Sequence, residues 1–194
     1  GDLIFCADDK GAVEVSKIIS VKRPDINLIP YGSKAEGKFK LNLIGVREEK
    51  NLFNIEGLGN FFLKVPGHHE VLDACAAVTL AVRILQEEKL LSDNFNNEEF
   101  VKTGFYDSVR KGLSLFSGGK RRSEIIGKFT NINGDNVVVI DDYGHHPTAV
   151  KTTLEGFREF YAGRKIIVDF MSHTYSRTQS LLKEFASSFE SADL

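Results

Sequence analysis

The stretch Val137-Val138-Val139-Ile140 runs directly into Asp141-Asp142-Tyr143-Gly144-His145-His146-Pro147. Consecutive β-branched residues without polar alternation are typical of a strand that is buried on both faces. Proline is favoured in the first turn of a helix, so we expect a helix over residues 147–161. A buried strand that leads through a polar loop into a helix is the repeating unit of open α/β sheets.

The residues beyond this helix repeat the same order of elements. An apolar run predicts a strand over residues 165–170, and helical spacing predicts a helix over residues 176–189. Strand, helix, strand and helix in succession favour a Rossmann-like open sheet. We therefore expect an α/β fold for this part of the chain.

The residues before residue 137 predict a hairpin and a domain boundary. Residues 124–132 and 137–140 are expected to form two strands, joined at Asn133-Gly134, which is a type I′ turn signal. Upstream of them, Ser117-Gly118-Gly119-Lys120 places two glycines where a helix is expected to end. We place the boundary here, so that residues 1–118 and 119–194 form two domains.

The first domain is also predicted to mix helices and strands. Strands over residues 3–7 and 27–31 flank a helix over residues 11–19, which predicts a βαβ unit with parallel strands. Alternating patterns then predict a hairpin or a small antiparallel meander, and two further helices follow. The patterns cover residues 39–46 and 51–65 for the strands, and residues 69–87 and 99–115 for the helices.

Composition excludes several classes of protein. Of the 194 residues, 42% are hydrophobic and 27% are charged, as in ordinary soluble globular proteins. The net charge of −2 offers no general attraction to nucleic acid or to an anionic membrane, so we expect neither as a partner. No apolar run approaches the roughly 18 residues of a membrane span. Cys6 and Cys75 lie among apolar residues, which favours free thiols in a reducing cytoplasm over a disulfide.

Two expected strand ends carry many hydrogen-bonding side chains. Residues 141–147 contain two aspartates, a tyrosine and two histidines, and residues 172–177 contain His173 and Arg177. In open α/β sheets, ligands bind beyond the carboxyl ends of the strands. Capping of the following helices explains one or two polar residues in each loop but not this density. We therefore predict a ligand site that both loops share.

Two other patterns suggest sites that we reject. Gly118-Gly119-Lys120 lacks the earlier glycine of a P-loop, and Arg121 stands where a Ser or Thr should bind Mg²⁺. The pairs His68-His69 and His145-His146 have no Cys or carboxylate at a zinc spacing, so we expect no metal bound by the protein alone. The basic run Lys120-Arg121-Arg122 is either a solvated patch or a junction from which an arginine reaches a phosphate.

Four stretches, in order along the chain, resemble the Mur ligase family. Residues 66–77, Pro-Gly-His-His-Glu-Val-Leu-Asp-Ala-Cys-Ala-Ala, are similar to a stretch that opens a helix of the family's central ATPase domain. Residues 121–124 resemble the start of its C-terminal domain. Residues 141–148 and 170–178 resemble the branch of the family that adds alanine.

The resemblance covers nearly the whole chain, and it implies a domain assignment. Residues 1–118 would be the C-terminal part of a central P-loop-type ATPase domain, and residues 119–194 the N-terminal part of a Rossmann-like C-terminal domain. The P-loop and a UDP-binding domain are then expected upstream of Gly1. We expect the 194-residue chain by itself to lack ligase activity.

The resemblance also implies which residues surround the nucleotide. His69 matches a position near ATP and its Mg²⁺, and Asp73 matches a position that contacts adenine. Arg122 matches an arginine that reaches the ATP phosphates. Asp142 matches an aspartate at the ribose.

A second set of matching residues is implied on the acceptor side. Tyr143, His145, His173 and Arg177 match groups around the incoming amino acid and the muramyl carboxylate. Three of them, His145, His173 and Arg177, together with Arg122, are the residues to which the resemblance assigns the catalytic work.

The activity implied is a step of cytoplasmic peptidoglycan precursor synthesis. L-alanine would be added to UDP-N-acetylmuramate through an acyl phosphate, with ATP and Mg²⁺ as cofactors. In such phosphoryl transfers, catalysis rests mainly on positioning and on neutralising phosphate charge.

The chain departs from the family pattern at three positions. Glu70 and Asp73 replace amides, and a carboxylate accepts hydrogen bonds but cannot donate them. Thr174 stands where the family often has arginine. Three alternatives therefore stay open: the ligase that recycles a tripeptide onto UDP-N-acetylmuramate, a non-catalytic relative that acts as a binding module, and an unrelated α/β protein.

Overall fold

The chain folds into two units, and the computed structural model describes all residues from 1 to 194. Unit 1 comprises residues 1–47, 51–63 and 69–115. Unit 2 comprises residues 48–50, 64–68 and 116–194. Both units contain helices and strands, so the predicted α/β class is confirmed. None of the helices has the length and apolar character that a membrane span requires.

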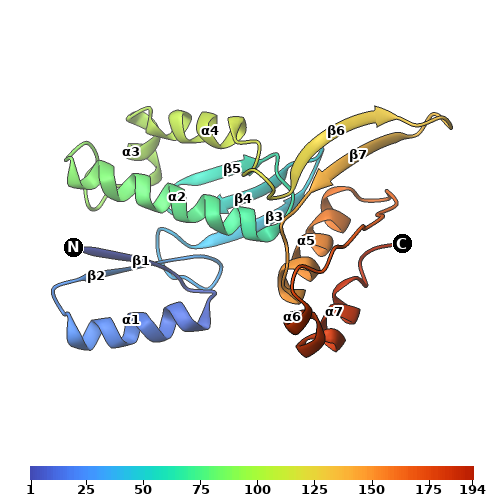
Figure 1. The fold of residues 1–194 in the computed structure, drawn as a ribbon. Coiled ribbons are helices and arrows are strands. Elements are labelled where there is room, and N and C mark those ends of the chain that lie inside the picture. The colour runs from blue at the N-terminus through green and yellow to red at the C-terminus, as the bar shows by residue number, and fades with distance from the viewer. The chain divides into compact units, whose positions relative to one another are not determined.

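Unit 1 begins with the predicted βαβ unit (Figure 1). Strands β1 (Asp2–Cys6) and β2 (Asn27–Tyr31) pair in parallel from Asp2 opposite Asn27 to Cys6 opposite Tyr31. Helix α1 (Lys10–Lys22) connects them and starts at Asp9, whose carboxylate accepts a hydrogen bond from the Ala12 N–H at 2.7 Å. That bond satisfies one of the free N–H groups of the first helical turn.

The alternating patterns that follow form an antiparallel meander, as predicted. Its strands are β3 (Leu41–Val46), β4 (Asn51–Ile55) and β5 (Gly59–Leu63), in the order β3-β4-β5. Helix α2 (His68–Glu87) supplies the apolar stripe that packs with the meander into one core. The largest completely buried side chains in that core include Phe53, Phe95 and Phe100.

The helix predicted over residues 99–115 is two helices, so that prediction is wrong in its continuity. Helix α3 (Asn97–Lys102) ends at Thr103, and helix α4 (Phe105–Leu115) begins two residues later. Gly104 between them has φ = +76°, a left-handed conformation that glycine adopts without steric cost. The left-handed residue breaks the helical hydrogen-bond pattern, which residue spacing alone does not reveal.

In unit 2, the predicted hairpin is present but its turn differs. Strands β6 (Glu124–Thr130) and β7 (Asn136–Asp141) pair antiparallel, with Thr130 opposite Asn136. Five residues, 131–135, connect them instead of a two-residue type I′ turn. The Asn131 side chain accepts hydrogen bonds from the N–H groups of Asn133 and Asp135, and this closes the longer turn.

The C-terminal part contains three helices. Helix α5 (Pro147–Phe160) begins at the predicted proline. The helix predicted over residues 176–189 is interrupted at Leu181, which separates α6 (Tyr175–Ser180) from α7 (Leu182–Ser188). This prediction is therefore correct in type and wrong in continuity.

The strand predicted over residues 165–170 does not form. Ile166 and Val168 exchange single backbone hydrogen bonds with Asp193 and Leu194, and no named strand pairs with this segment. A strand assignment needs a continuous ladder with a neighbour, and apolar composition alone cannot supply one.

Two helix-interior glycines offer a matched pair of substitutions. A Cβ at Gly156 of α5 would lie 2.7 Å from the Cα of Gly67, whereas a Cβ at Gly112 of α4 would meet nothing within 4 Å. We expect Gly156→Ala to destabilise the fold by roughly 1–3 kcal/mol through overpacking. Gly112→Ala should be neutral or stabilising by up to about 1 kcal/mol, because alanine is the better helix former. Urea unfolding followed by circular dichroism measures both, and equal effects would contradict this packing.

The Cys75 thiol gives a second test. Burial in the unit 1 core raises its pKa to about 12 from the ordinary 9.0. Its neutral form is thus favoured in the folded state, so this contribution to stability is complete below pH 9 and is lost as the pH rises toward 12. At pH 9 in Cys6→Ser, the folded thiol should hold roughly two to three orders of magnitude less thiolate than the unfolded one. Iodoacetamide should then label Cys75 far more slowly in buffer than in urea, and similar rates would refute the shift.

Candidate functional site

The acceptor-side residues predicted in unit 2 gather around the ring of Tyr143. The ring centroid of His145 lies 5.1 Å from that of Tyr143, and the centroid of His173 lies 6.0 Å from it. Both imidazoles lie edge-on to the phenol ring. Residues from two separate loops, 142–146 and 161–174, therefore meet at one side chain, as the density of polar residues suggested.

Asp142 holds the loop that carries Tyr143. Its Oδ1 accepts a hydrogen bond from the Gly144 N–H at 2.7 Å, which closes a local turn. Its Oδ2 accepts one from the Ser123 N–H at 2.8 Å, and Ser123 is 2% exposed. The two oxygens of one half-buried carboxylate thus join the loop after β7 to the segment before β6. Charge-assisted hydrogen bonds of this kind are stronger than neutral ones.

The segment before β6 adopts an uncommon backbone. Arg121 has φ = +55° and Ser123 has φ = +48°, values that few residues other than glycine adopt. Hydrogen bonds hold this conformation: the Arg121 N–H donates to Glu124 Oε2 at 2.6 Å, and the Arg121 carbonyl accepts from the Tyr143 N–H at 2.9 Å. The segment and the Tyr143 loop are therefore bound to each other through both backbone and side chains.

The two histidines of this loop have different partners. His145 Nδ1 lies 3.0 Å from the Tyr143 carbonyl oxygen, which orients the imidazole. His146 precedes α5, and its Nδ1 accepts a hydrogen bond from the Thr148 N–H at 3.3 Å. Capping at the start of this helix thus falls to His146, while His145 stays beside Tyr143.

Arg177 from α6 reaches the same loop. Its Nη1 donates to the His145 carbonyl at 3.3 Å. The ring of Tyr143, which is 48% exposed, is bordered by the Arg121 guanidinium, 4.8 Å from its centre, and by two imidazoles. Such an arrangement suits a ligand that presents a carboxylate or phosphate next to an apolar part.

Arg122, which the resemblance placed at the ATP phosphates, makes no ion pair or side-chain hydrogen bond in the structure. Its backbone N–H donates to the Gly119 carbonyl at 3.0 Å, and its side chain is exposed. The neighbouring Arg121, for which we predicted no role, contacts the site through Asp141 and the Tyr143 ring. The run of basic residues contains no signal that distinguishes it from Arg122.

The predicted nucleotide residues of unit 1 lie on the first turns of α2. His69 Nε2 is 3.7 Å from the carboxylate of Glu70, which is 5% exposed. Asp73 is exposed and lies near Tyr31, at the carboxyl end of β2. Burial raises the pKa of Tyr31 to about 12, and the charges of Cys6 and Asp73 add to the shift. Unit 1 thus places these two predicted residues near one end of its helix and sheet.

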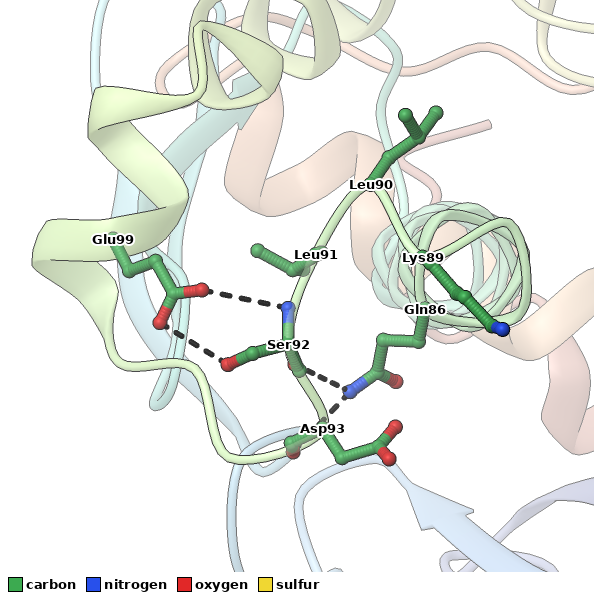
Figure 2. A pocket seen from close by; sticks show the side chains of 7 residues that line it. All are labelled: Gln86, Lys89, Leu90, Leu91, Ser92, Asp93 and Glu99. Carbon is green, nitrogen blue, oxygen red and sulfur yellow. Dashed lines mark hydrogen bonds between the residues drawn. The ribbon is translucent and has the colours of Figure 1, made fainter.

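A pocket open to solvent lies elsewhere, at the far end of α2. It has a volume of about 380 Å³ and is lined by the residues labelled in Figure 2. Its polar side chains are engaged with one another, since Glu99 accepts from the N–H and hydroxyl of Ser92, and Gln86 donates to the carbonyls of Ser92 and Asp93. These bonds fasten the loop after α2 to α3, and we assign the pocket no ligand.

Comparison with families of known proteins gives a match within the second unit. Residues 121–194 match the family described as "Mur ligase, glutamate ligase domain". Over the whole chain, a UDP-N-acetylmuramate–L-alanine ligase of Treponema pallidum is 42% identical, and one of Borreliella burgdorferi is 34% identical. The chain spans 38% of the length of each of these relatives.

Solved structures show the same likeness. A UDP-N-acetylmuramate-alanine ligase from Thermotoga maritima matches 84% of this chain and 32% of its own, with 25% identity and a TM-score of 0.58. A folylpolyglutamate synthetase from Lactobacillus casei matches 94% of this chain and 40% of its own, with 10% identity and a TM-score of 0.55. At that identity the second structure supports the fold alone.

The Asp142 carboxylate can be tested as the tie between the two loops. Asp142→Ala leaves the buried N–H of Ser123 and the N–H of Gly144 without their acceptor. We expect a loss of roughly 1–3 kcal/mol in the free energy of unfolding. Asp135→Ala, in the exposed β6–β7 turn, is the control and should cost less than about 1 kcal/mol. Equal losses of unfolding free energy in the two variants would contradict the role of Asp142 in joining the two segments.

Proposed function

The chain belongs to the Mur ligase family, and we propose that the protein adds L-alanine to UDP-N-acetylmuramate in an ATP-dependent reaction. The observation that carries the proposal is the meeting of His145 and His173 at the Tyr143 ring, with Arg177 bonded to the His145 carbonyl, within the segment that matches the Mur ligase domain. Whole-chain identity of 42% to a ligase with that name supports the choice of substrates. Because the chain spans 38% of that relative, the activity is proposed for the full-length protein.

The reaction of such a ligase proceeds in two steps. The muramyl carboxylate attacks the γ-phosphorus of ATP, which gives an acyl phosphate and ADP. The amine of L-alanine then attacks the acyl carbon, and inorganic phosphate leaves as the amide forms. Both steps place negative charge on phosphate oxygens, so cations and orientation supply most of the catalysis.

The residues of this chain divide the work by location. Arg122, exposed before β6, would neutralise phosphate charge, because a guanidinium keeps its charge at any physiological pH. Tyr143, His145, His173 and Arg177 would bind and orient the carboxylate-bearing substrates. Asp142 keeps acceptor capacity for a ribose hydroxyl beside its two backbone bonds.

Mg²⁺ and adenine would be met by residues of α2. Nucleotide-bound Mg²⁺ takes one or two protein carboxylates together with phosphates and water, and it neutralises phosphate charge. The Glu70 carboxylate beside His69 is an oxygen donor of the required kind. The Asp73 carboxylate would accept a hydrogen bond from the adenine amino group.

A second candidate follows from the carboxylates on α2. Glu70 and Asp73 add negative charge where a nucleotide would be bound, which disfavours a triphosphate unless a cation is present. A relative that keeps the fold as a binding module without catalysis would tolerate them. Calorimetry of the full-length protein with ATP and Mg²⁺ separates the two, because the module predicts no binding.

The proposal predicts phosphate release that depends on L-alanine. Full-length protein with ATP, Mg²⁺ and UDP-N-acetylmuramate should release phosphate when L-alanine is added. Release with a tripeptide in place of L-alanine would favour the recycling ligase instead. The 194-residue chain alone should be inactive, and alanine-dependent release by it would contradict that expectation.

Arg122 provides the residue-level test of the same proposal. Arg122→Gln should lower kcat/KM for ATP by about 10- to 150-fold, the value of one hydrogen bond to a charged group. Arg23→Gln is the control, since Arg23 is exposed and pairs with Asp25 after α1. Equal kinetics for Arg122→Gln and the wild-type protein would remove Arg122 from the nucleotide site.

A further inference from the structure

Arg121 differs from its neighbour Arg122 in what its guanidinium touches. The Arg121 Nε donates to Asp141 Oδ2 at 3.1 Å, and the guanidinium carbon lies 4.8 Å from the centre of the Tyr143 ring. A cation over an aromatic face within about 6 Å is attracted by the ring's quadrupole. Arg121 therefore links the end of β7 to the tyrosine around which the candidate site is built.

The backbone of Arg121 is hydrogen-bonded at both its N–H and its carbonyl. Its N–H is held by Glu124, and its carbonyl accepts the N–H of Tyr143 itself. With φ = +55°, the residue directs its side chain differently from a residue in extended backbone. Both ends of Arg121 thus contact the segment that carries Tyr143, the backbone through its carbonyl and the side chain through the ring.

The ion pair with Asp141 orients the Arg121 guanidinium but adds little to the stability of the fold. The side chains of Arg121 and Asp141 are 53% and 37% exposed, and exposed ion pairs of this kind contribute little to stability. Their hydrogen bond nevertheless restricts the guanidinium to one side of the Tyr143 ring. The two imidazoles that contact this ring approach it edge-on.

We propose that Arg121 is a positioning residue, which holds the Tyr143 ring in the orientation that the substrate carboxylate group meets. The inference deepens the proposed function and rests on it, because it takes Tyr143 to be on the substrate side. Arg121 acts through Tyr143 and makes no contact with phosphate. Adjacent arginines therefore have separate tasks: Arg122 at the nucleotide and Arg121 at the acceptor pocket.

A kinetic split in the full-length protein tests this role. Arg121→Gln should raise KM for L-alanine or UDP-N-acetylmuramate by roughly two- to fivefold, the value of one exposed cation–π contact, and leave kcat within about twofold. Arg121→Lys keeps a cation for the ring and should restore part of the loss. A fall in kcat with both KM values unchanged would overturn the proposal.

A double-mutant cycle separates action through Tyr143 from a direct role. In a Tyr143→Leu background the ring is gone, so Arg121→Gln should cause no further rise in KM. Independent, additive effects of the two substitutions would mean that Arg121 acts elsewhere. Arg164→Gln is the matched control, because Arg164 also lies over a tyrosine ring, that of Tyr161 at 5.8 Å, and it should leave KM unchanged.

A measurement without catalysis distinguishes failure of this inference from failure of the proposed function. In full-length protein labelled with 3-fluorotyrosine, the ¹⁹F resonance of Tyr143 is assigned by its loss in Tyr143→Phe. Arg121→Gln should shift that resonance, and Arg164→Gln should not. A shift in a protein that ligates nothing would support the contact and refute the function. An unshifted resonance would overturn the positioning role whether or not the protein is a ligase.

Discussion

The hydrogen bonds accepted by the Asp142 carboxylate are the constraint on which the unit 2 site depends. One bond closes the turn at Gly144, and a second reaches the buried N–H of Ser123, nineteen positions earlier in the chain. The Ser123 hydroxyl donates a third, longer bond to the same oxygen at 3.5 Å. Without them, the two irregular segments would be joined by the backbone bond from the Tyr143 N–H to the Arg121 carbonyl and by the exposed Arg121 side chain. With them, Tyr143 has a defined place, and the imidazoles and guanidinium around it have a common target.

Elements that rest on local signals could be predicted from the sequence. The βαβ unit, the meander and α5 follow from periodicity, from capping and from a proline at the first helical position. Elements that depend on distant partners could not. Residues 165–170 have strand composition but no neighbouring ladder, and the left-handed Gly104 interrupts a continuous apolar pattern. Sequence patterns give the local propensity for a helix or a strand, whereas pairing and packing with distant segments determine whether that element forms.

The candidate site divides in the same way. The density of polar residues after β7 and before α6 predicted that two loops share a site, and Tyr143, His145 and His173 do meet. The choice between Arg121 and Arg122 was beyond the sequence, because the guanidinium that lies over Tyr143 belongs to a segment in which Arg121 and Ser123 have positive φ angles. Positive φ angles are typical of glycine and enriched for Asn, Asp and His, and neither arginine nor serine is one of these residue types.

Asp142 shows how a residue can serve the fold and the ligand together. A carboxylate has about four acceptor positions; the N–H and hydroxyl of Ser123 occupy two on Oδ2, and the Gly144 N–H occupies one on Oδ1. A ribose hydroxyl could use the remaining position on Oδ1 without displacing any of these bonds. The structural role therefore does not compete with the proposed role at the nucleotide. The structural role of Asp142 favours nucleotide binding, because an acceptor that the fold already holds in place loses little conformational entropy when a ligand binds.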